Sequence, residues 1–390
     1  MKTMLKRVLT LAIAAVMLLT LAACGGSNYT ANNTEYVIGV SGPLTGGAAV
    51  YGVAVKNSAQ MAVDEINAAG GLNGVKFKFV ATDDTHDATK VAANYAKMLE
   101  EGMQVSLGTV TTAPGLEFTN LSKEDNVFFL TPSASGDDIP KNDNGFQMCF
   151  ADGNQGKVAA DYVNGLGLET IGIFYKSDDA YSNGIYKQFK ENLKSSIKTV
   201  EAVFTDANAT DFSAQITSLK DCSFIFMPIY YQPASIFMTQ AKDTIAANAV
   251  YYGCDGFDGL AGQFEDFSII PQEVSMLSHF DSNATEGASF EYIKKYTEKF
   301  GTDTLNQFGA SAYDCVYAIF NAMKAAIDAG EEIDVTISAS DLCDILKKQF
   351  TGDFSYDGVT GTGAITWEDN GYVSKEAVKY TLKAANADEK

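Results

Sequence analysis

The sequence has 390 residues, of which 46% are hydrophobic and 20% are charged, so the chain can bury a sizeable core. Its formal net charge is −21 at pH 7. This excludes the basic face that binding to DNA or RNA requires, and it disfavours attachment to an anionic membrane surface. At about 100–200 residues per domain, the length predicts two or three domains.

The N-terminus predicts a secretory signal peptide over residues 1–23. Lys2, Lys6 and Arg7 precede an apolar run that extends to residue 23. A positive start, a short apolar stretch and small residues before the cleavage point are typical of such signals. The run is short for a permanent transmembrane helix, which needs about 20 apolar residues.

The end of this run resembles the lipobox of bacterial lipoproteins. The sequence LAAC occupies residues 21–24, which implies that Cys24 becomes the acylated first residue of the mature protein. Residues 24–34 are rich in Gly, Ser and Asn, and we expect them to form a flexible tether.

Five further cysteines are widely spaced and form no C-x-x-C pair, which argues against a zinc site or a disulfide framework. The sequence favours buried thiols and leaves open a single disulfide. These cysteines are Cys149, Cys222, Cys254, Cys315 and Cys343.

Alternating strand and helix patterns begin at residue 35. Val55, Ala59 and Ala62 recur at helical spacing until Gly70 and Gly71 end the segment. Such alternation predicts parallel sheets with right-handed crossovers, here in two α/β halves that divide near residues 151–156. We predict strands at 36–40, 75–79, 105–108, 127–130, 170–175, 200–204, 224–227 and 250–252, and helices near 55–66, 91–99, 185–193 and 234–247.

Small hydroxyl residues follow the strand ends of the first half. They lie in the loops SGPLTGG at 41–47, GTVTTAP at 108–114 and TPSASG at 131–136. Ligands of parallel sheets bind beyond the carboxyl ends of the strands, and hydroxyls beside free N–H groups at a helix start suit a carboxylate or phosphate. Helix capping and turns are the plainer interpretation of any one loop, with Pro114 as the first helical residue. Three such loops together favour a binding edge.

The second half places different side chains at its strand ends. Tyr181 follows the polar segment 176–179, Tyr230 follows the strand at 224–227, and Asp255 lies just before Gly256. Aromatic rings supply apolar area with a polar tip, and a carboxylate accepts hydrogen bonds from an ammonium. An acid beside glycine is more often a turn residue. Hydroxyls on one half, with aromatic rings and one acid on the other, would suit a zwitterion held between the two halves.

Taken in order, these loops resemble the type I periplasmic-binding family, in particular the branched-chain amino-acid receptors of ABC importers. The likeness runs from about residue 36 to 375. The matching stretches are IGVSGPLTG at 38–46, AVDEINAAGGLNG at 62–74, TPSAS at 131–135 and TGTG at 360–363.

The resemblance implies an α/β fold of two Rossmann-like lobes with parallel sheets, joined by three crossover strands and closing on a ligand like a hinged clamp. We expect lobe I to comprise residues 35–153 and 284–358. We expect lobe II to comprise residues 154–283 and 359–385.

The resemblance also implies roles for seven residues. The Thr112 hydroxyl would hold the α-carboxylate, the Ser135 N–H and hydroxyl would contact both charged groups, and the Ser133 carbonyl would accept from the ammonium. Asp255 would be the counter-ion of that ammonium. The aromatic residues that match the pocket are Tyr51, Tyr181 and Tyr230.

Two departures from the family pattern concern this same region. Asp255 stands where such receptors usually carry glutamate, so its carboxylate reaches one methylene less far. His86 and Thr111 stand where some members have a cysteine pair.

An enzyme is the first rival interpretation. His86 and His279 are the only histidines, and neither accompanies a G-x-S-x-G, Walker or G-x-G-x-x-G motif. We predict no catalysis, no cofactor and no metal. The acids of 83–87 could bind a cation, but we interpret them, like Asp178 and Asp179, as solvated surface.

We therefore expect a monomeric, lipid-anchored extracytoplasmic protein that binds a branched-chain or small polar amino acid and delivers it to an ABC permease. The alternative is a ligand-sensing subunit, or a receptor for amides or aromatic acids, on the same fold.

Overall fold

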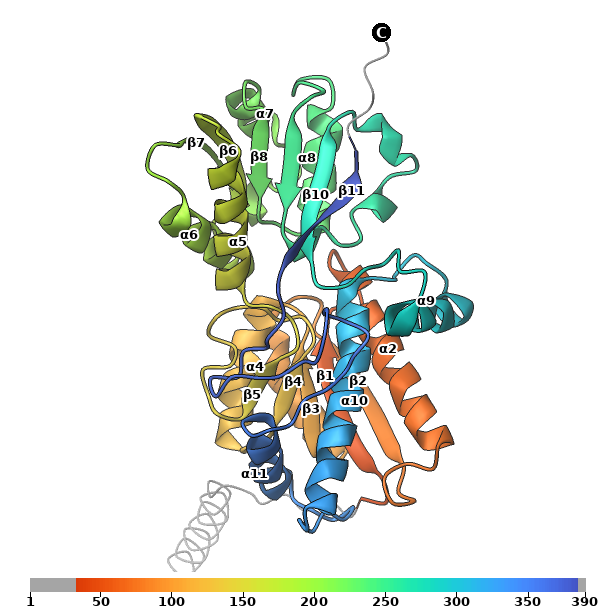
Figure 1. Cartoon of the computed structure of the whole chain (residues 1–390). Coiled ribbons are helices and arrows are strands. Elements are labelled where there is room, and N and C mark those ends of the chain that lie inside the picture. Colours follow the sequence, from red (N-terminus) through yellow and green to blue (C-terminus); the bar gives the residue numbers. More distant parts are fainter. Residues whose placement is uncertain (1–32, 385–390) are drawn as a thin grey trace, which may run out of the picture.

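The structure is a computed structural model and describes residues 33–384 (Figure 1). The predicted signal peptide, Cys24 and residues 24–32 of the tether lie outside the described residues. Figure 1 shows two α/β lobes, one above the other.

Lobe I contains a sheet of five strands in the order β2-β1-β3-β4-β5, and all the pairs are parallel. Its strands are β1 (Tyr36–Gly42), β2 (Phe77–Asp83), β3 (Val105–Thr109), β4 (Phe129–Thr131) and β5 (Gly145–Gln147). Its helices are α2 (Ala49–Ala68), α3 (Val91–Glu100), α4 (Thr112–Glu124), α9 (Gly287–Phe300), α10 (Gln307–Asp328) and α11 (Ala339–Phe350).

Lobe II contains a sheet of six strands in the order β11-β10-β9-β8-β6-β7. Only β11 runs antiparallel to its neighbour among these described strands, so the sheet is mostly parallel. Its strands are β6 (Thr170–Lys176), β7 (Lys198–Phe204), β8 (Phe224–Met227), β9 (Val250–Gly253), β10 (Glu273–Ser278) and β11 (Val378–Lys383). Its helices are α5 (Asp152–Gly165), α6 (Ala180–Asn192), α7 (Ser213–Leu219) and α8 (Tyr231–Ala241).

Helices cover both faces of each sheet, and successive strand residues point to opposite faces. Side chains on both sides of a strand are therefore buried. In β1, Ile38 and Val40 pack into the core shared with α2 and α10, whereas Val37 packs with residues of α3 and α4. In β8, Ile225 packs with α7 and α8, and Phe226 packs with α5 and α6. This explains why these strands read as continuous apolar runs.

Three connections join the lobes, at residues 148–151, 279–286 and 374–377. The last one lies later than the boundary at residue 359 that we expected. Trp367 packs on Phe350 with ring centroids 4.5 Å apart and donates from Nε1 to the Gln147 carbonyl, so its segment belongs to lobe I. The chain enters lobe II only just before β11.

The expectation of two α/β lobes with largely parallel sheets is confirmed, and each predicted strand and helix has a counterpart. Strands β5, β10 and β11 and helices α5, α7, α9, α10 and α11 were not predicted from the sequence. The five cysteines of the described chain are free and buried. No helix within residues 33–384 is long and apolar enough to cross a membrane.

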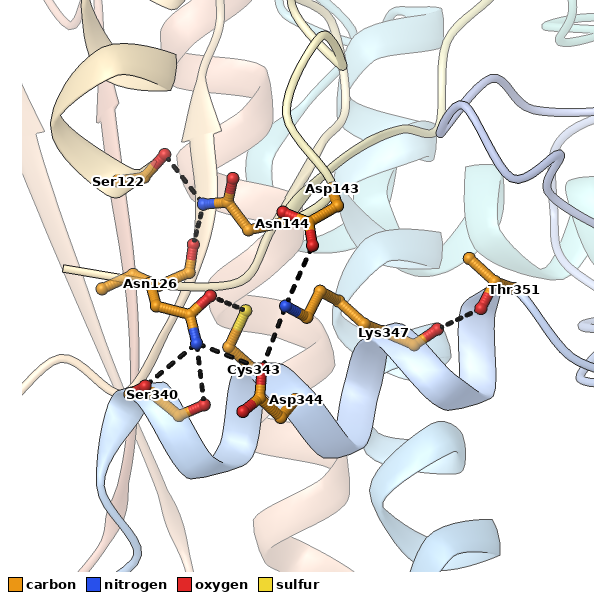
Figure 2. Close-up of polar contacts among 10 residues, drawn as sticks. Ser122, Asn126, Asp143, Asn144, Ser340, Cys343, Asp344, Lys347 and Thr351 are labelled. Atoms are coloured by element: carbon orange, nitrogen blue, oxygen red, sulfur yellow. Dashed lines mark hydrogen bonds and ion pairs between the residues drawn. The ribbon is translucent and has the colours of Figure 1, made fainter. Parts of the chain in front are cut away.

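Helix α11 is held against lobe I by a polar cluster around Asn126 (Figure 2). Asn126 has a φ of 49°, a left-handed conformation that asparagine tolerates better than most residues. Its Nδ2 donates to both Ser340 oxygens and to Asp344, and Lys347 bridges Asp344 and Asp143. One side chain thus fixes the turn after α4 and the start of α11 together.

Replacing Asn126 should therefore loosen α11. We expect Asn126→Ala to lower the free energy of unfolding by about 2 kcal/mol, since it loses these hydrogen bonds and places alanine, which tolerates a left-handed conformation less well than asparagine, at this φ. Asn126→Gly should cost less, because glycine adopts this φ freely. Urea denaturation of the two variants checks the order, and equal losses would contradict the backbone part of the argument.

Candidate ligand-binding site

The carboxyl ends of the parallel strands of both sheets face each other where the lobes meet, the position at which open parallel sheets bind ligands. A small cavity lies there. All seven residues assigned from the sequence line it, so the structure brings them together; their role in binding stays a prediction. The lining residues are Tyr51, Val110, Thr111, Thr112, Ser133, Ser135, Tyr181, Tyr230, Asp255 and Phe308.

Asp255 is the buried acid of this cavity, and only 2% of its surface is exposed. Its Oδ1 accepts from the Tyr181 hydroxyl at 2.7 Å, and its backbone N–H donates to Gln155 Oε1 at 3.0 Å. Burial raises the pKa of Asp255 to about 7, against the opposing effects of Tyr181 and Gln155. No positively charged group is among the causes of this shift, so the ionised carboxylate lacks a partner that would stabilise its charge.

The opposite wall of the cavity carries hydroxyl groups. Thr112 begins α4, and its buried Oγ1 has no hydrogen-bond partner in the described part of the chain. Ser133 and Ser135 are also buried and come from the loop after β4. A buried hydroxyl without a partner loses its interaction with water, so it marks a position where a polar group fits.

Aromatic residues join the two lobes around the cavity. Tyr51 of α2 donates its hydroxyl to the Gly256 carbonyl of lobe II at 2.6 Å, and its ring meets Tyr231 edge-on at 4.9 Å. Tyr181 and Tyr230 stack with centroids 4.5 Å apart. The lobes are therefore closed on each other, and the cavity lies inside the closed interface.

Several residues of this region were not predicted from the sequence. Phe308 lines the cavity from the first turn of α10, a helix that was not predicted. Gln155 and Asp152 lie behind Asp255 on α5, and burial together with the charge of Asp255 raises the pKa of Asp152. The Asn306 cap before Gln307 could have indicated the start of α10, but only the tertiary fold brings Phe308 to the cavity.

The family model described as periplasmic binding protein matches residues 35–384. The chain belongs to the periplasmic binding protein family. It is 29% identical over 323 residues to the Leu/Ile/Val-binding protein BraC3 of Rhizobium johnstonii, covering 80% of this chain and 84% of that one.

Two further relatives have the same character. Identity is 29% over 245 residues to a leucine-, isoleucine-, valine-, threonine- and alanine-binding protein of Pseudomonas aeruginosa, covering 60% of this chain and 64% of the other. The isoleucine complex of the branched-chain amino-acid transporter protein LivJ from Streptococcus pneumoniae superposes with a TM-score of 0.74 at 26% identity, covering 89% and 100%.

Family membership settles two expectations for this periplasmic binding protein. Its family and fold are those of transporter substrate-binding proteins rather than enzymes. The family also implies an extracytoplasmic location. The type I periplasmic-binding resemblance is thereby confirmed.

His86 contacts two of the residues that line the cavity, Thr111 and Tyr230. Its Nδ1 lies 2.9 Å from Thr111 Oγ1, so a hydrogen bond occupies the position where we noted the lack of a cysteine pair. Its ring also meets Tyr230 edge-on at 5.3 Å, and its Nε2 lies 3.9 Å from Asp179 of lobe II. His86 thus contacts both lobes.

Two acids interpreted as solvated surface are in fact buried. Asp84 is fully buried and accepts from the Ser41 hydroxyl and the His86 N–H. Asp179 is 6% exposed and caps α6 through the Ser182 N–H. Both carboxylates organise loops at the cleft because backbone N–H groups there need acceptors. The described residues hold no group of three or more acidic, His or Cys side chains that could bind a metal ion.

A larger cavity lies at the hinge, between the second and third connections of this periplasmic binding protein. Its floor includes His279 and Lys375, and Lys375 donates to Thr360, which in turn donates to Asp314. This lysine already shares its charge with an internal network. The small cavity at the strand ends is therefore the candidate binding site.

The raised pKa of Asp255 predicts a pH-dependent stability. An acid with a pKa of about 7 in the folded protein and an ordinary value of 3.8 destabilises the fold as pH rises between the two. Asp255→Asn should therefore stabilise the unliganded protein at pH 8 by up to about 4 kcal/mol, and have little effect at pH 4. Urea unfolding at both pH values checks this, and a loss of stability at pH 8 would contradict it.

Proposed function

We propose that this protein is a lipid-anchored extracytoplasmic receptor that binds an α-amino acid between its lobes and delivers it to an ABC permease. The observation that carries this proposal is the pairing, within one cavity, of the buried Asp255 carboxylate and the buried, unpartnered Thr112 hydroxyl. An ammonium would supply the positive charge that Asp255 lacks, and a carboxylate would accept from Thr112.

The two groups come from different lobes, which supports a closing mechanism. Thr112 lies at the start of α4 in lobe I, whereas Asp255 follows β9 in lobe II. An amino acid that pairs with both would be fully engaged only when the lobes are closed. The hydrogen bond from Tyr51 to the Gly256 carbonyl joins the two lobes in this closed form. A membrane partner that binds the closed form more tightly than the open form would then recognise the protein with its ligand bound.

The names of the relatives support an amino acid as the ligand class, since those proteins bind leucine, isoleucine, valine, threonine or alanine. The lipobox at residues 21–24 supports the anchor. The permease, the lipid on Cys24 and the monomeric state are proposals that rest on the family and on that motif.

An amide or aromatic acid without an ammonium is the alternative ligand. It would leave the buried Asp255 unpaired or force it to remain protonated, and either costs binding energy. We therefore place an amino acid ahead of it. A role in sensing rather than import uses the same site and differs only in the membrane partner.

Thermal-shift screening of the twenty amino acids tests the ligand class. At least one of them should raise the melting temperature by several degrees at a hundredfold excess over Kd. Asp255→Asn should weaken binding of that amino acid by about 3–5 kcal/mol, and Thr112→Val by about 1.5–3 kcal/mol.

Two matched variants control for unspecific effects. Asp221→Asn changes an exposed acid, and Thr119→Val removes a buried hydroxyl of α4 that donates to the Ile139 carbonyl. Neither should change amino-acid affinity. Stabilisation by benzoate or an amide, with no response to any amino acid, would overturn the proposal.

Affinity should also depend on pH, because Asp255 must be ionised to pair with an ammonium. With a pKa of about 7, the amino acid must displace a proton below that value. We expect Kd to rise about tenfold for each pH unit below 7 and to be constant above pH 8. Calorimetric titration in two buffers of different ionisation enthalpy measures the proton release, and a pH-independent Kd between 5 and 8 would contradict the role of Asp255.

A further inference from the structure

Two hydroxyl groups of the cavity wall keep free hydrogen-bonding capacity after the charged ends of an amino acid are bound. Under the proposed function, those ends engage four of the lining residues, and the other six surround the side chain. These six are Tyr51, Val110, Thr111, Tyr181, Tyr230 and Phe308. The Tyr51 and Tyr181 hydroxyls already donate to Gly256 and Asp255. The two groups that remain are the hydroxyls of Thr111 and Tyr230.

His86 determines what the Thr111 hydroxyl can offer. Its Nδ1 lies 2.9 Å from Thr111 Oγ1, and its Nε2 faces Asp179 at 3.9 Å. Burial lowers the pKa of His86, against the opposing charge of Asp179, so the ring is neutral at pH 8. A neutral imidazole carries one hydrogen, and the Asp179 carboxylate favours it on Nε2. Nδ1 is then a hydrogen-bond acceptor.

Thr111 therefore presents an acceptor to the cavity. Its hydroxyl has a single hydrogen, which it donates to His86, and its oxygen keeps a lone pair for another donor. The residue is only 2% exposed, so bulk water does not supply that donor when the lobes are closed. A donor on the ligand would supply it.

Tyr230 presents a donor from the other lobe. Its ring is fixed, because it stacks on Tyr181 at an interplanar angle of 12° and meets His86 edge-on. Its hydroxyl bonds to no group within residues 33–384. Burial raises the pKa of Tyr230 well above its ordinary value, so the hydroxyl keeps its hydrogen. Tyr230 precedes α8 in lobe II, whereas Thr111 precedes α4 in lobe I.

We propose that this site selects amino acids whose side chain carries a hydroxyl or a primary amide over aliphatic amino acids of the same size. The proposal rests on the proposed function and adds the chemistry of the side chain. A hydroxyl or amide donates to Thr111 and accepts from Tyr230 at the same time. An aliphatic side chain leaves both groups without a partner in a closed site, and sites built for hydrogen bonds reject such analogues.

Isothermal titration calorimetry with two isosteric pairs tests the selection at pH 8, where Asp255 is ionised. The pairs are L-threonine with L-valine and L-asparagine with L-leucine, so size is held constant within each. The polar member of at least one pair should bind at least tenfold more tightly than its apolar partner. Apolar members that bind as tightly or more tightly in both pairs overturn the polar selection and leave the amino-acid receptor standing. Binding of none of the twenty amino acids overturns the proposed function itself.

Variants that remove one hydroxyl each identify the residues responsible. Thr111→Val and Tyr230→Phe should each lower the affinity of the preferred polar amino acid about fivefold or more, with little change for its apolar isostere. A general loss of stability would weaken both ligands alike, so the affinity ratio reports the hydrogen bond.

Two matched variants remove the same groups from buried positions that do not line the cavity. Thr119→Val acts in α4, and Tyr251→Phe removes a buried hydroxyl of β9 that has no partner among the described residues. Both should leave the affinity ratio unchanged. An unchanged ratio in folded Thr111→Val and Tyr230→Phe overturns the assignment of these two residues. The wild-type titrations decide the polar selection even if a variant does not fold.

Discussion

A carboxylate buried without a cation is the constraint around which the two lobes are arranged. Asp255 keeps its position because Tyr181 donates to it and Gln155 holds its backbone. The same Tyr181 hydroxyl accepts from Gly256, whose carbonyl receives the Tyr51 hydroxyl from the other lobe. One chain of hydrogen bonds therefore links the acid, the aromatic wall and the contact that closes the lobes. Any group that compensates the charge of Asp255 also acts on closure.

Under the proposed function, this arrangement lowers the stability of the unliganded protein in favour of recognition. Burial costs the folded protein free energy wherever Asp255 is ionised. The partly exposed Asp258 accepts from the Gln307 N–H across the interface. A protein selected for stability alone would carry a neutral residue at position 255. A buried acid that faces a cavity is expected where a cationic group binds. The free energy that its burial costs in the unliganded protein is regained only by a ligand with a positive charge, so such a ligand is favoured over a neutral one.

Much of the fold could be predicted from the sequence because parallel strands give long apolar runs and their ends give loops of small polar residues. That logic placed Thr112, Ser133 and Ser135 beyond the strand ends of one lobe and Asp255 beyond those of the other. It could not find β5, whose three residues Gly145–Gln147 are too few for a pattern. It also missed α10, which is apolar on most of its surface. The position of Phe308 could not be predicted for a related reason, since its place in the cavity depends on how α10 crosses lobe I.

The acids of the cleft show where composition misleads. The excess of Asp and Glu suggested solvated turns, yet Asp83 and Asp84 hold Thr85 and His86 at φ values of 54° and 65°. Two successive left-handed residues with side chains are costly, and they persist only because these carboxylates accept their N–H groups. The result is a loop that presents the His86 ring to Thr111 on one lobe and to Tyr230 on the other. The local sequence predicts a polar surface for such residues. Their role in holding the loop depends on the strand ends that surround them, which the local sequence does not show.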